Sequence, residues 1–84
     1  MFFSFNPSSV FGNKLEKGLA FATNQGDDSV SVIYLNDFKV IKTIKVGKAP
    51  AGIAIDELNG YLFVSNAEDK SISVIKINEL KIIK

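Results

Sequence analysis

Short runs of hydrophobic residues alternate with polar clusters along the whole chain. Residues 29–35 read SVSVIYL and residues 71–77 read SISVIKI, and both runs are rich in β-branched side chains. Neither run has the i, i+3, i+4, i+7 spacing of apolar residues that marks an amphipathic helix. Runs of this length and composition, bounded by turn residues, predict β-strands.

Further apolar runs lie before and after these two strands. They cover residues 19–23, 40–46, 52–55, 61–65 and 82–84, and residues 9–12 form a shorter run. Turn sequences rich in Asn, Asp and Gly separate the runs, and Asn59-Gly60 is a signal for a type I′ hairpin. Because such short connections join antiparallel neighbours, the runs predict four-stranded meanders.

The chain repeats itself at an offset of 42 residues, which places residues 16–42 on residues 58–84 with 12 identities over 27 positions. A period of this length matches a four-stranded blade of a β-propeller. We therefore predict an all-β fold of two four-stranded antiparallel β-propeller blades in tandem, a partial propeller, at residues 1–47 and 48–84. Residues 9–12 are expected as the first strand of the first blade. The Phe-rich start, Phe2 to Phe5, is expected as the end of a neighbouring blade's outer strand.

Both faces of the predicted sheets carry apolar side chains. In the third strand of the first unit, Val30, Val32 and Tyr34 point to one side, and Ile33 and Leu35 point to the other. A sheet with one face in water would alternate apolar with polar residues. Two apolar faces favour a blade covered on both sides over the competing two-sheet sandwich, which leaves both outer faces uncovered.

Three motifs recur in the order seen in a known repeat. FATN at 21–24 and FVSN at 63–66 each precede an acidic turn and then an SVSVI or SISVI strand, and VGKAP at 46–50 gives a Val-Gly-x-x-Pro element. The chain thus resembles the YVTN-type β-propeller repeat, although its first unit has only SFNP at 4–7 in place of that element. The resemblance implies rings of about seven or eight blades, in exported or cell-surface proteins of archaea and bacteria, with similar propellers in lactonase-like enzymes and some reductases.

Composition narrows the chemistry. The chain has no Cys and no His, so neither a disulfide framework nor a histidine base or histidine-ligated metal can be built from it alone. A net charge of +1 and the absence of Arg argue against nucleic acid. No apolar stretch is long enough to span a membrane, and MFFSFNPSSV at 1–10 lacks the basic region of a signal peptide. We expect a soluble chain with no catalytic residue, cofactor or metal site.

The polar turns are the candidate binding site. In a propeller, the loops between second and third strands and those between successive blades share one face. The residues expected on that face are Asn24, Asp27, Asp28, Lys48, Pro50, Asn66, Glu68 and Asp69. Such loops can recognise protein or carbohydrate. The plain alternative is that Asn, Asp and Gly are there because tight turns need left-handed geometry and Asx hydrogen bonds.

Two functions of different class remain open from the sequence. The first is a non-catalytic interaction or structural scaffold, and the second is a segment of a lactonase-like or redox propeller enzyme whose active site lies in other blades. Because a propeller closes with typically about four to eight blades, two blades predict other propeller blades as partners. We expect a fragment of a longer propeller or, as the alternative, a half-unit that assembles with copies of itself, and a lone two-blade fold is the third outcome.

Overall fold

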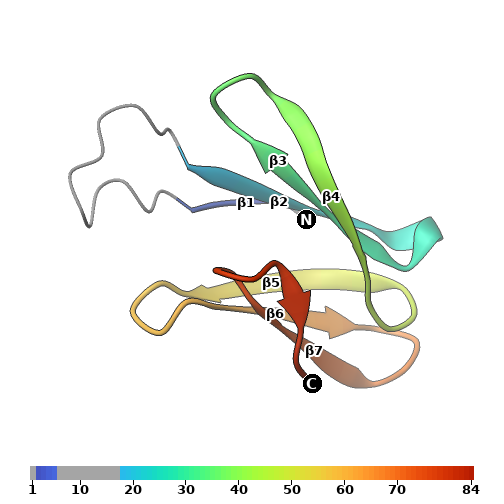
Figure 1. Ribbon diagram of the computed structural model, residues 1–84. Coiled ribbons are helices and arrows are strands. Elements are labelled where there is room, and N and C mark those ends of the chain that lie inside the picture. The colour runs from blue at the N-terminus through green and yellow to red at the C-terminus, as the bar shows by residue number, and fades with distance from the viewer. Residues whose placement is uncertain (1, 6–17) are drawn as a thin grey trace.

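Eight β-strands in two sheets make up the part of the chain that the computed structural model describes, residues 2–5 and 18–84 (Figure 1). The first sheet contains β1 (Phe2–Phe5), β2 (Leu19–Asn24), β3 (Ser29–Tyr34) and β4 (Lys39–Lys45). The second contains β5 (Pro50–Asp56), β6 (Tyr61–Asn66), β7 (Ser71–Lys76) and β8 (Lys81–Ile82). A 3-10 turn, η1 (Gln25–Asp27), joins β2 to β3. Neighbouring strands are antiparallel, so the predicted all-β fold of two antiparallel sheets is confirmed.

The first strand differs from the expectation. Phe2–Phe5 pairs with β2 of the first sheet, with Phe3 opposite Phe21, so this segment is not part of a neighbouring blade. It takes the place that we expected for residues 9–12, which lie outside the described residues. Three phenylalanines in four residues have a stronger strand propensity than the run SVFG, which ends in glycine.

The repeat extends to the backbone conformation of the turns. In each sheet, three turn residues have a positive φ, and the two sets are related by the 42-residue offset. The pairs are Gly18 and Gly60 (φ 101° and 76°), Asp28 and Lys70 (54° and 52°), and Phe38 and Leu80 (58° and 51°). Gly adopts this left-handed region readily, and Asn and Asp adopt it at some cost. The turn geometry is therefore repeated even where the residue type is not.

The hairpin between β5 and β6 forms where the sequence predicts it, but with another turn. A type I′ turn needs a positive φ at both central residues. Gly60 has a positive φ, but Asn59 does not. Instead, a four-residue turn spans residues 57–60. The Asp56 carboxylate accepts hydrogen bonds from the backbone N–H of Asn59 (3.2 Å) and from its side-chain amide (2.8 Å). These hydrogen bonds lower the pKa of Asp56 below its ordinary value, and the one from the Asn59 side chain has the larger effect.

The outermost strand of each sheet has a β-bulge at the same repeat position. Between β3 and β4, Val32 lies opposite Lys42 and Ile33 lies opposite Val40, so Ile41 is an extra residue. In the second sheet, the carbonyl of Val74 accepts from the N–H of Ile83 (2.8 Å), and the N–H of Val74 donates to the carbonyl of Lys84 (3.0 Å). Ile83 and Lys84 therefore both lie opposite Val74, which is the arrangement of a β-bulge.

The two sheets pack face to face around one hydrophobic core (Figure 1). The innermost strands lie closest, since β5 contacts both β1 and β2. The buried core residues come from both sheets: Phe21, Val30, Val32 and Ile44 from the first, and Ile53, Leu62, Val64, Ile75 and Ile77 from the second. One face of each sheet is thereby removed from water.

The sheets use opposite faces for this contact. The first sheet buries the face that carries Phe21, because Phe21 lies opposite Val32 in the strand register and both are fully buried. Its equivalent at the 42-residue offset, Phe63, lies on the outer face of the second sheet. The second sheet buries the face that carries Leu62 and Ile75. We call these two sides of a sheet its aromatic face and its aliphatic face.

Candidate functional site

The loop between β4 and β5 is hydrogen-bonded to the first sheet through Asp28. The N–H of Val46 donates to the Asp28 carbonyl (3.0 Å), and the N–H of Ala49 donates to the Asp28 carboxylate (3.0 Å). Asp28 has a positive φ at the end of η1, which brings its carbonyl and its carboxylate toward the same loop. One residue of the first sheet therefore holds both ends of residues 46–49.

The same loop is also hydrogen-bonded to the turn between β6 and β7. The N–H of Ala67 donates to the carbonyl of Ala49 (2.9 Å), and that of Glu68 donates to the carbonyl of Lys48 (3.2 Å). In the reverse direction, the N–H of Lys48 donates to the carboxylate of Asp69 (2.8 Å). The VGKAP segment thus joins one sheet to the other through hydrogen bonds on both sides.

Gly47 stands where a larger residue would not fit. A Cβ built at this position would lie 2.7 Å from the Asn66 amide and 2.7 Å from the Asp69 carboxylate oxygen. Real Cβ atoms essentially never approach other heavy atoms this closely. The glycine of the Val-Gly-x-x-Pro element therefore allows the loop to lie directly against the second sheet.

Asn66 has its side chain in the interior at this end of the second sheet. Only 1% of it is exposed, and its Nδ2 donates to the hydroxyls of Ser71 (3.2 Å) and Ser73 (3.0 Å). Its Oδ1 is buried and has no hydrogen-bond partner among the described residues. The hydrogen bonds of this amide therefore join the end of β6 to β7.

Asn24 makes the same hydrogen bonds in the first sheet. Its Nδ2 donates to the hydroxyls of Ser29 (3.1 Å) and Ser31 (2.8 Å), and the Ser29 hydroxyl donates to the Asp27 carboxylate (3.1 Å). The Asp27 carbonyl accepts a hydrogen bond from the Lys45 ammonium (2.9 Å). The N-x-x-x-x-S-x-S spacing common to both units is thus a repeated structural motif, which the identities at the 42-residue offset already marked.

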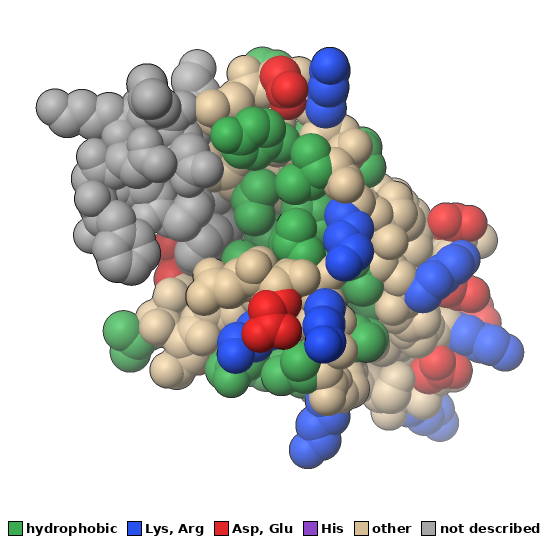
Figure 2. Space-filling model, in the orientation of Figure 1, with side chains coloured by type: hydrophobic (Ala, Val, Ile, Leu, Met, Phe, Trp, Pro, Cys, Tyr) green, Lys and Arg blue, Asp and Glu red, His purple; other side chains and the backbone are tan. Residues whose placement is uncertain are grey.

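The structure brings all the predicted site residues to one end of the two sheets, where acidic and basic side chains are mixed (Figure 2). Asn66 and Pro50 are buried, Asn24 and Asp28 are half-buried, and Asp27, Lys48, Glu68 and Asp69 are exposed. Five of these side chains already take part in hydrogen bonds within the chain: Asn24, Asp27, Asp28, Asn66 and Asp69. Across residues 2–5 and 18–84, no three His, Cys, Asp or Glu side chains group as metal ligands would.

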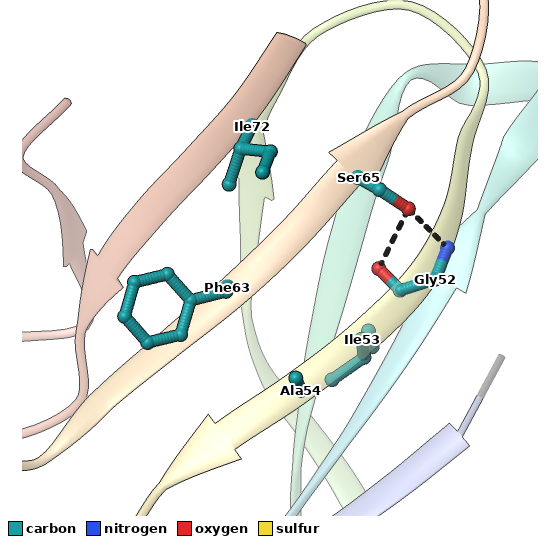
Figure 3. A pocket seen from close by; sticks show the side chains of 6 residues that line it. All are labelled: Gly52, Ile53, Ala54, Phe63, Ser65 and Ile72. Carbon is teal, nitrogen blue, oxygen red and sulfur yellow. Dashed lines mark hydrogen bonds between the residues drawn. The ribbon is translucent and has the colours of Figure 1, made fainter.

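An apolar hollow that the sequence patterns did not predict lies on the outer, aromatic face of the second sheet. Its volume is about 280 Å³, and it is lined by Gly52, Ile53, Ala54, Phe63, Ser65 and Ile72 (Figure 3). The Ser65 hydroxyl accepts from the N–H of Gly52 (3.0 Å) and donates to its carbonyl (3.5 Å), so the polar groups of the hollow satisfy one another. The sequence signal that could have found it was the second apolar face of the sheet.

No helix in the described part of the chain is both long enough and apolar enough to cross a membrane.

Comparison with known proteins supports the fold. No protein-family model and no curated protein matches the chain. Among solved structures, the chain is similar to hydrazine synthase from Kuenenia stuttgartiensis, with a TM-score of 0.74 and 32% sequence identity, over 79% of this chain. The match spans 19% of the hydrazine synthase chain, and that protein contains a β-propeller. The two antiparallel meanders therefore have a propeller-like fold, and the resemblance to the YVTN repeat stays a prediction.

Proposed function

We propose that this chain is a non-catalytic β-propeller repeat segment, which acts as a structural or interaction scaffold. The observation that carries the proposal is the connection made by residues 46–49. Their backbone is hydrogen-bonded to Asp28 of the first sheet, and to Asp69 and the turn before it in the second. Such a connection serves to hold one blade on the next.

The use of the polar side chains agrees with this role. The Asp28 and Asp69 carboxylates, which would be the natural ligands for a cation or a sugar hydroxyl, accept hydrogen bonds from backbone N–H groups. Lys48 and Glu68 remain exposed on the same loops and could contact a protein or carbohydrate partner. Recognition by this end of the molecule therefore depends on few side chains, held on a rigid frame.

A second candidate is a segment of a larger propeller enzyme, lactonase-like or redox, whose active site lies in other blades. The observation that favours it is the similarity to hydrazine synthase, of which the match covers 19%. In that case the residues described above would keep their structural role, and the chemistry would come from outside residues 1–84. Other blades carrying His, Arg and Glu toward the central channel would support this candidate.

The experiment that tests the scaffold role of this chain compares catalysis with stability. The purified chain is assayed for hydrolysis of lactone and ester substrates, and we expect no rate above that of buffer. In parallel, Asp69→Ala and the exposed control Glu68→Ala are unfolded in urea. We expect a loss of about 1 kcal/mol for Asp69→Ala, since its carboxylate no longer accepts the hydrogen bond from the backbone N–H of Lys48, and little change for the control. If the purified chain turned over a substrate, and a fully folded Asp69→Ala variant did not, the scaffold role would be overturned.

A further inference from the structure

The aromatic face of the second sheet lies open to solvent. Ile72 is 62% exposed, Phe63 and Val74 are half-buried, and Ala54 is exposed. These four side chains share one side of the sheet, because Phe63 lies opposite both Ala54 and Val74 in the register. Three of them, Ala54, Phe63 and Ile72, line the hollow of about 280 Å³ (Figure 3). An apolar sheet face left in water usually marks an interaction surface.

The molecule itself shows what covers such a face. The equivalents of Phe63, Ile72 and Val74 at the 42-residue offset are Phe21, Val30 and Val32. All three equivalents are 0% exposed, because the aliphatic face of the second sheet packs on them. The aromatic face of the first sheet is therefore covered by an aliphatic face, and the equivalent face of the second sheet is left uncovered.

The matching cover is also present on the chain. The aliphatic face of the first sheet is the side that carries Ile33, which is the equivalent of the fully buried Ile75. Ile33 is half-buried and its neighbour in the register, Val40, is 58% exposed, whereas Ala20 on the same side is already shielded. One copy thus exposes an aromatic face at one end and aliphatic side chains at the other.

A small polar ligand is a poor occupant of the hollow. The polar groups of Ser65 and Gly52 are hydrogen-bonded to each other, so the hollow offers such a ligand mainly apolar contacts. Charge does not prevent a second copy from docking there, because the net charge is +1 and the nearby Lys76 ammonium is paired with Glu79 at 3.5 Å. An apolar sheet face is matched best by another apolar sheet face.

We propose that the aromatic face of the second sheet binds the aliphatic face of the first sheet of a second copy of this chain. The contact is head to tail and repeats the one inside the chain, so it continues from copy to copy until a ring closes. The inference rests on the proposed function, since it treats each sheet as a propeller blade. It adds the surface, the partner and the direction of assembly.

The test uses one charge on each surface. Ile72→Lys alters the aromatic face and Val40→Lys alters the aliphatic face, and both positions are exposed, so both variants should fold. Leu58→Lys, at a 93% exposed residue in the turn between β5 and β6, is the matched control. Folding is checked by circular dichroism, and mass is measured by light scattering and by sedimentation equilibrium over a range of concentrations.

We expect the wild type and Leu58→Lys to form multiples of the 9.2 kDa chain. Ile72→Lys and Val40→Lys should each weaken association at least about a hundredfold, because a lysine would be buried without a partner. An equimolar mixture of these two variants should form a dimer and stop there, since one undamaged interface remains between them. A face that paired with itself would instead let Val40→Lys assemble alone.

Three results would overturn the inference: a wild type that stays at 9.2 kDa at all concentrations, a Val40→Lys variant that still assembles, or a mixture that does not dimerise. None of them bears on the scaffold role, which the catalytic assay and the Asp69→Ala comparison test separately. Failure of assembly and failure of the proposed function are therefore distinguishable.

Discussion

Replacing Gly47 by alanine is the sharpest test of the connection between the sheets. The added methyl group would lie 2.7 Å from the Asn66 amide and 2.7 Å from the Asp69 carboxylate. Asn66 has no room to move, because it is 1% exposed and hydrogen-bonded to two serines. Asp69 can rotate away, but it then loses its hydrogen bond from the N–H of Lys48.

The expected cost follows from these contacts. Overpacking a fixed site costs about 1–3 kcal/mol, and a lost hydrogen bond adds about 1 kcal/mol. Alanine also lowers the conformational entropy of the unfolded chain, which stabilises the folded state by about 0.4–1 kcal/mol. The free energy of unfolding should therefore fall by about 1–3 kcal/mol, which lowers Tm by roughly 5–20 °C in a domain of this size.

Gly26→Ala is the matched control, because no atom lies within 4 Å of a Cβ built there and its φ is not in the left-handed region. We expect that variant to be unchanged or more stable by up to about 1 kcal/mol. Both variants are unfolded by heat and by urea and followed by far-ultraviolet circular dichroism, since the chain has no Trp. In a Gly47→Ala background, Asn66→Ala should cost less than it does alone, because it removes the group that the methyl contacts. Equal stability of the two glycine variants would show that the close approach of the loop is not required.

Three further predictions concern single side chains. Asn66→Ala should cost about 2–3 kcal/mol and Asn24→Ala about 1–2 kcal/mol in urea unfolding, since both lose two hydrogen bonds but Asn66 is the more buried; the reverse order would contradict this. Phe38→Asn should raise the free energy of unfolding by about 0.5–1 kcal/mol, because Phe38 is 78% exposed at φ 58° and Asn tolerates that conformation; a loss would show hidden packing. Asp56 has a lowered pKa in the folded state, so its contribution is present above 3.8 and is lost as pH falls through the folded value. Asn59→Ala should raise that pKa in a carboxyl NMR titration, and an unmoved pKa would refute the hydrogen-bond cause.

The sequence predicted the two sheets because the strands are short, β-branched and repeated. Apolar residues on both sides of the third strand, such as Val32 and Ile33, also predicted that sheets cover one another, and Val32 is indeed fully buried. The first strand was placed wrongly because the repeat begins only at residue 16, so Phe2–Phe5 had no equivalent to guide its assignment. The left-handed Phe38 could not be predicted either, because the conformation is imposed by the hairpin and opposes the residue's own preference.

The candidate site was predicted in its position and not in its contacts. Successive turns of a meander alternate between its two ends, so the grouping of Asn24, Asn66 and the VGKAP loop follows from the strand order alone. The hydrogen bond from the N–H of Ala49 to the Asp28 carboxylate joins residues 21 positions apart, and no local pattern encodes it. The same holds for the hollow beside Phe63, which exists only because the second sheet has one uncovered face.

The bulges in the outer strands bear on whether another chain can add a strand to these sheets. β4 and β8 are edge strands, and an unprotected edge offers free backbone groups to which another chain can add a strand. Here an extra residue, Ile41 or Ile83, breaks the regular spacing of those groups, and a lysine, Lys42 or Lys84, follows directly. Uncontrolled growth by strand addition, of the kind that leads to fibrils, is therefore opposed at the β4 edge of the first sheet and at the β8 edge of the second.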